Sequence, residues 1–90
     1  MAAAPRFKVY NGTEYIAGFK SGHDVVLFCM AKGGLGLQVR MGHRAVVYTF
    51  PQDSLLVSPD LLGIRMDRWY YEYDKTGVAP DPIPTGAPIP

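Results

Sequence analysis

Few side chains in this sequence could do chemistry near neutral pH, and they are dispersed. His23 and His43 are the candidates for general acid–base catalysis, because an imidazole titrates close to neutrality. His23 falls in the first turn of an expected helix and His43 in an expected hairpin turn, and both positions tend to be solvated. Cys29 lies between two apolar residues in the middle of the same helix, where a buried neutral thiol is expected.

These three residues do not make a recognisable site. No Ser–His–Asp or Cys–His set has enough members for nucleophilic catalysis. One cysteine and two histidines hold no metal without carboxylates, and none can be placed beside them. The glycine-rich stretch 33–36 follows a helix and precedes a strand, which is the wrong order for a phosphate loop. The sequence therefore predicts no enzyme, no metal site and no cofactor.

The most unusual stretch is WYYEY at 69–73, which follows two arginines. One interpretation is that Trp69 and Tyr73 cover an apolar helix, which predicts a mostly buried Trp69. Aromatic residues beside arginine are also typical of protein-interface hot spots and of base-stacking platforms. Two isoleucines between prolines in the tail are further apolar anchors for a partner. The candidate protein-interface residues are Trp69, Tyr70, Tyr71, Tyr73, Arg65, Arg68, Ile83 and Ile89.

Single-stranded nucleic acid is the alternative ligand, bound by basic and aromatic residues on the outer faces of the expected strands. The net charge is only +1, but it is unevenly distributed. Residues 1–50 carry six basic and two acidic side chains, and residues 51–90 carry three basic and six acidic ones. This asymmetry favours attraction between the two halves over a basic surface, because the basic residues are scattered. The nucleic-acid candidates are Lys8, Tyr10, Tyr15 and Arg40.

A β-hairpin is expected over residues 6–19. Asn11-Gly12 between two β-rich runs is a strong hairpin signal, since both residues tolerate the positive φ of a type I′ turn. That turn places Phe7 opposite Ile16 and puts Val9 on the same face. The other face then carries Lys8, Tyr10, Tyr15 and Phe19.

A helix is expected from about His23 to Lys32. Ser21 can cap its first turn, Asp24 sits where a capping-box carboxylate would, and glycines follow its end. Residues 25–31 are all apolar, so the helix must be covered on more than one side. One sheet covers one side only, and the segment 61–73 is expected to cover the other.

A second hairpin is expected over residues 35–50, turning near Gly42-His43. One face then consists of Leu35, Leu37, Val39, Val46, Tyr48 and Phe50, and the other of Gln38, Arg40, Ala45, Val47 and Thr49. The two hairpins and the first helix together predict one continuous core. Its expected strand residues are Phe7, Val9, Ile16, Leu37, Val39, Val46 and Tyr48.

A second helix is favoured after Ser58-Pro59-Asp60, with proline at its first position and an acid in its first turn. Leu62, Met66, Trp69 and Tyr73 recur at helical spacing. A strand is the alternative, because the tyrosines at 71 and 73 alternate with Glu72. From residue 75 onward the prolines predict an extended tail. We therefore expect one α+β domain over residues 1–74 in the order ββαββ with a C-terminal helix, and a proline-rich tail over 75–90.

The bulk composition fits a small globular protein, with 48% hydrophobic and 19% charged residues. The polar start of the chain, residues 1–6, predicts no signal peptide, and no apolar run approaches the roughly 20 residues that span a bilayer. We therefore expect an intracellular setting and no membrane partner.

Several short stretches resemble a group of small uncharacterised proteins encoded by bacteriophages and mobile elements. They are Lys8-Val9-Tyr10, Tyr15-Ile16-Ala17, the helix start at Asp24, and the run from Gly42 to Tyr48. The resemblance covers residues 6–50 and implies a strand–strand–helix–strand–strand order in a bacterial cytoplasm or a virion. It implies no catalytic or binding residue.

Together, these observations predict a non-enzymatic protein-binding module that blocks or bridges another protein, such as a host factor or virion component. The identity of the partner does not follow from the sequence, and a second copy of the chain is one candidate. Binding of single-stranded nucleic acid is the alternative.

Overall fold

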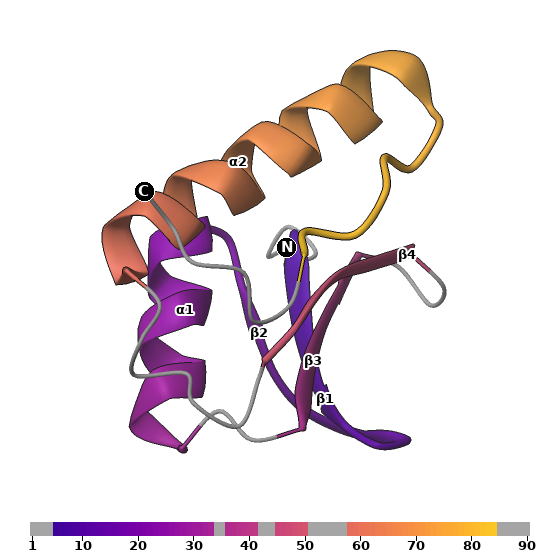
Figure 1. The fold of residues 1–90 in the computed structure, drawn as a ribbon. Coiled ribbons are helices and arrows are strands. Elements are labelled where there is room, and N and C mark those ends of the chain that lie inside the picture. Colours follow the sequence, from indigo (N-terminus) through magenta and orange to yellow (C-terminus); the bar gives the residue numbers. More distant parts are fainter. Residues whose placement is uncertain (1–4, 34–35, 42–44, 51–57, 85–90) are drawn as a thin grey trace.

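The computed structural model describes residues 5–33, 36–41, 45–50 and 58–84. The elements follow the order β1 (Phe7–Asn11), β2 (Glu14–Phe19), α1 (Gly22–Ala31), β3 (Leu37–Met41), β4 (Ala45–Thr49) and α2 (Pro59–Thr76). The four strands form one antiparallel sheet in the order β2-β1-β3-β4, and both helices lie on the same side of it (Figure 1). The α+β class and the hairpin–helix–hairpin–helix order are confirmed.

The first hairpin turns one residue later than predicted, which changes the pairing of its two strands. The loop is Gly12-Thr13, and Asn11 is the last residue of β1, paired with Glu14. Of the turn residues only Gly12 has a positive φ, +65°, which is typical of a type II′ turn and not of type I′. A bulge follows, and the residue opposite Phe7 is Phe19.

The predicted core position of Ile16 is therefore wrong, and Ile16 is exposed. It falls at the bulge, which inserts one extra residue into β2 and resets the alternation of faces. Phe19 takes the inner position instead, where its ring lies 5.0 Å from that of Phe28 in α1. The register thus buries a larger apolar side chain than the predicted one.

The second hairpin also contains a bulge that the alternating sequence does not reveal. Val39 pairs with Tyr48, but Arg40 pairs with Val46, so Val47 is the extra residue. Val46 is therefore half-buried beside Arg40, and Val47 is fully buried, which reverses the prediction for both. Leu37, Val39, Tyr48 and Phe50 are buried as predicted. Leu35 and the predicted turn at 42–43 lie outside the described residues.

Both helices begin at the predicted caps. The Ser21 hydroxyl accepts a hydrogen bond from the Asp24 backbone N–H at 3.4 Å, and the Ser58 hydroxyl accepts one from Leu61 at 3.5 Å. The favoured helix for the second segment is confirmed, and its strand alternative is wrong. α2 ends at Thr76, and the following Gly77 has a φ of +73°, the left-handed conformation of a C-cap.

α2 crosses the N-terminal end of α1, as Figure 1 shows. Gly22 and Gly63 meet at the crossing, and a Cβ on Gly63 would stand 2.9 Å from the Cα of His23. The Asp67 carboxylate accepts a hydrogen bond from the Gly22 backbone N–H at 2.9 Å, which links the two helices at this point. The buried residues of α1 are Gly22, Val25, Val26 and Cys29, and those of α2 are Leu62, Gly63, Met66 and Trp69.

After α2 the chain returns to the open edge of β4. The Ile83 backbone N–H donates to the Val47 carbonyl oxygen at 2.8 Å, and the Ile83 side chain is buried. The Trp69 indole N–H donates to the Asp81 carbonyl oxygen at 3.0 Å. Residues 79–84 therefore pack on the domain without forming a helix or a strand.

Candidate binding surfaces

The outer face of the sheet carries the four nucleic-acid candidates in adjacent positions. Lys8 in β1 is paired with Arg40 in β3, and Tyr10 in β1 is paired with Tyr15 in β2. These residues alternate with buried Phe7, Val9 and Val39, so they point away from the helices. We call Lys8, Tyr10, Tyr15 and Arg40 the outer-sheet row.

Direct contacts hold the outer-sheet row in place. The guanidinium carbon of Arg40 stands 4.6 Å from the centre of the Tyr10 ring, which is the geometry of a cation–π contact. The Tyr10 and Tyr15 rings meet edge to face, with their centres 5.7 Å apart. The Tyr15 hydroxyl lies over Gly18, only 2.7 Å from where a Cβ would stand. The absence of a side chain at Gly18 thus leaves room for this orientation of Tyr15.

Polar side chains extend this network to the fourth strand. Arg40 donates through Nε to the Gln38 side-chain oxygen at 2.6 Å, and the Gln38 amide nitrogen donates to the Thr49 hydroxyl at 3.3 Å. Arg40 is thus fixed on two sides, by an aromatic face and by an amide oxygen. Its guanidinium keeps donors for an acceptor such as a phosphate oxygen.

The protein-interface candidates do not form one surface. Trp69 is only 3% exposed, as predicted, and Ile83 is 9% exposed, so both belong to the core of the chain. Tyr73 meets Trp69 edge to face at 5.4 Å. The side chains of Arg65 and Arg68 are exposed. Ile89 lies outside the described residues.

The outward face of α2 carries an apolar stripe, of which the sequence pointed only to Arg68 and Tyr71. Leu61, Ile64 and Tyr71 are 37%, 64% and 65% exposed, and Arg68 lies between the last two along the helix. Their spacing of three, four and three residues places all four on one side of the helix. We call these four residues the α2 stripe. A search of this segment for a second set of apolar residues at helical spacing, besides the buried set, would have revealed the stripe.

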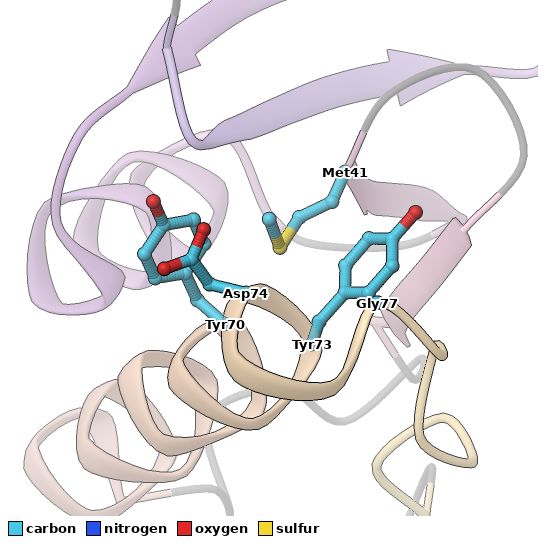
Figure 2. A pocket seen from close by; sticks show the side chains of 5 residues that line it. All are labelled: Met41, Tyr70, Tyr73, Asp74 and Gly77. Carbon is cyan, nitrogen blue, oxygen red and sulfur yellow. The ribbon is translucent and has the colours of Figure 1, made fainter.

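Described residues of α2 line hollows at two places along the helix. One, of about 340 Å³, lies between the arginine side of the helix and the returning tail at residues 80–84. The other, of about 330 Å³, lies between the end of α2 and the end of β3 (Figure 2). Its described lining is Met41, Tyr70, Tyr73, Asp74 and Gly77. Neither hollow was predicted, because each depends on how α2 and the tail pack on the sheet.

Of the residues considered for catalysis, the structure describes His23 and Cys29, both in α1. His23 Nε2 stands 3.4 Å from an Asp60 carboxylate oxygen, and both side chains are exposed. Cys29 is fully buried, and this burial raises the pKa of its thiol to about 12. His43 lies outside the described residues. Within the described part of the chain, no cluster of three or more His, Cys, Asp or Glu side chains could hold a metal ion.

Comparison with known proteins gives no relative for the chain. No protein-family model matches it, and neither a curated protein nor a solved structure does. Among the described residues, neither helix combines the length and apolar character required to cross a bilayer.

Proposed function

We propose that this protein binds single-stranded nucleic acid across the outer face of its sheet. The observation that carries the proposal is the convergence of Lys8, Tyr10, Tyr15 and Arg40 from three neighbouring strands. Aromatic side chains on an open sheet stack with unpaired bases, and nearby cations bind the phosphates. Both helices pack on the opposite side of the sheet, so neither covers this row (Figure 1).

The chemistry of the row predicts weak, sequence-tolerant binding. Tyr15 is half exposed and offers the most accessible ring for a base. Lys8 and Arg40 are two cations, and each phosphate that a protein neutralises on a single strand contributes about −0.7 to the salt slope. We therefore expect the logarithm of the association constant to fall with the logarithm of salt concentration with a slope of about −1.4.

Fluorescence anisotropy of a labelled oligothymidylate tests this proposal. Tyr15→Leu removes the most exposed ring and should weaken binding about tenfold, because stacking contributes on the order of 1–3 kcal/mol per base. Arg40→Gln should weaken binding and lower the salt slope. Tyr71→Leu and Arg65→Gln are matched controls, since they remove an exposed tyrosine and an exposed arginine from α2. Equal losses in the test and control variants would contradict the assignment of the surface.

A second candidate function is non-enzymatic binding of a protein, which the aromatic residues beside arginine in the sequence also favour. The α2 stripe favours it, because an exposed apolar seam with an arginine is typical of helix-mediated contacts. A second copy of the chain is the simplest occupant, since a helix seam with alternating three- and four-residue spacing can pair with itself about a two-fold axis.

The oligomeric state in solution tests this second candidate. Sedimentation over a range of protein concentrations should show a monomer–dimer equilibrium that Ile64→Asp abolishes. Ile64 is largely exposed, so this substitution should leave the fold of the monomer intact. A wild-type protein that stays monomeric at every concentration would exclude self-association through the stripe.

A further inference from the structure

We propose that the hollow between α2 and β3 binds an organic cation, specifically an alkylammonium group. Tyr70, Tyr73 and Asp74 come from the last turns of α2, at a spacing that places them on one side of the helix. Met41 ends β3 and extends toward α2, with Tyr70 on one side of it and Tyr73 on the other in Figure 2. The hollow has about 330 Å³, ample space for a small ammonium group with its alkyl substituents.

The described lining favours a positive ligand for three reasons. The faces of tyrosine rings carry negative partial charge and attract ammonium groups. The Asp74 side chain supplies a carboxylate, and no basic side chain is among the described lining residues. The Met41 thioether and the ring carbons provide contacts for the alkyl part.

The same lining disfavours other ligand classes. An anion would meet the Asp74 carboxylate with no described cation in the lining to compensate. A purely apolar ligand would cover that carboxylate without pairing it, which costs free energy. An alkylammonium group satisfies both the carboxylate and the apolar surface.

One of these rings already binds a cation within the chain. The guanidinium carbon of Arg6 stands 4.5 Å from the centre of the Tyr70 ring. Arg6 is not among the described residues that line the hollow. The Tyr70 ring is therefore shared between an internal cation contact and the hollow. The hollow borders α2, on the helix side of the sheet, so the cation site is separate from the outer-sheet row.

The experiment is a titration of the full chain with choline, monitored by the backbone amide resonances in nuclear magnetic resonance. Choline should shift the amides around Tyr73, Asp74 and Gly77. Its uncharged isostere 3,3-dimethyl-1-butanol has the same shape and should bind at least about fivefold more weakly. Equal binding of the two compounds, or no shift around the hollow at any soluble concentration of choline, would overturn the proposal.

Variants test the two groups that recognise the charge. Tyr73→Leu and Asp74→Asn should each weaken choline binding by about fivefold, whereas Tyr73→Phe retains the ring and should bind like the parent. Tyr71→Leu and Glu72→Gln remove a tyrosine and an acid from the same helix without changing the described lining, and should have no effect. The Tyr73 ring packs on Trp69, whereas Asp74 is exposed. If Tyr73→Leu unfolds the protein, the choline affinity of Asp74→Asn therefore tests the proposal. Parent-like choline binding by Asp74→Asn would overturn the role of the carboxylate.

A second arm identifies the source of the cation. Nα-acetyl-lysine methylamide presents a lysine ammonium as a protein partner would. Binding of this compound at least as tightly as choline would identify a lysine side chain as the ligand. Preference for choline would identify a free quaternary amine.

Discussion

Gly22 and Gly63 are in direct backbone contact where α1 and α2 cross: a methyl group on Gly22 would overlap the carbonyl oxygen of Gly63. Because the obstructing atoms are backbone, no side-chain rotation can relieve the overlap. The short distance between α1 and α2 therefore requires glycine at both positions. α2 in turn carries Trp69 into the core.

Gly63→Ala should destabilise the protein despite improving helix propensity. Alanine gains up to about 1 kcal/mol over glycine in a helix, but the new methyl would lie 2.9 Å from the Cα of His23. Forcing the helices apart costs about 1–3 kcal/mol or more. Chemical denaturation should show a net loss of about 1–2 kcal/mol. Ile64→Ala, at the next and exposed position, should change stability by less than about 0.5 kcal/mol.

Aspartate substitutions at two neighbouring valines test the bulge in the second hairpin. Val47→Asp should unfold the protein, because it places an unpaired charge at a fully buried position. Val46→Asp should be much milder, because Val46 is half-buried beside Arg40 on the outer face. Thermal melts followed by circular dichroism compare the stability of the two variants. Strict alternation without a bulge predicts that Val46→Asp is the more destabilising substitution.

Ile83→Ala should weaken the contact of the tail with β4 and lower the free energy of unfolding by about 2 kcal/mol. The Trp69 fluorescence should shift to longer wavelength, since the segment that accepts its indole hydrogen bond loses its anchor. Val78→Ala is the matched control, because Val78 is an apolar tail residue that is 71% exposed. A Val78→Ala effect as large as that of Ile83→Ala would mean that the Ile83 contact does not hold the tail.

Stability should fall with rising pH because of Cys29. Its pKa is raised to about 12 from an ordinary value of 9.0, so the unfolded chain loses this proton at a lower pH than the folded one. Below pH 9 both states keep the proton and the group has no effect. Between pH 9 and 12 the folded state is penalised by up to roughly 1.4 kcal/mol per pH unit. The Cys29→Ala variant lacks this contribution, so the stability difference between parent and variant should decrease only above pH 9.

Much of the fold could be predicted because local signals and the global structure agree. Ser21 and Ser58 mark both helix starts, and the wholly apolar run at 25–31 requires a second covering element, which α2 supplies. Burial of Trp69 follows from the same requirement.

The bulges could not be predicted, because a bulge is a tertiary compromise with no signature in the alternation of residues. In the second hairpin, the pairing of β4 with β3 leaves Val47 as the extra residue of the bulge. In the first hairpin, Phe19 packs on Phe28 and Ile16 is left at the bulge. For the candidate site, Tyr10, Tyr15, Lys8 and Arg40 could be named from residue type, but their convergence depends on the β1–β3 pairing between hairpins. The hollow around Met41 and Tyr73 joins residues far apart in sequence, so no local pattern reveals it.

The most direct test of the central claim is a nuclear magnetic resonance titration of the labelled protein with oligothymidylate. Binding by the outer-sheet row predicts shifts confined to the amides of β1, β2 and β3 around Lys8, Tyr10, Tyr15 and Arg40. In Tyr15→Leu the same shifts should require an oligonucleotide concentration about tenfold higher. Shifts centred on the α2 stripe, or an unchanged spectrum at the highest oligonucleotide concentration, would contradict it.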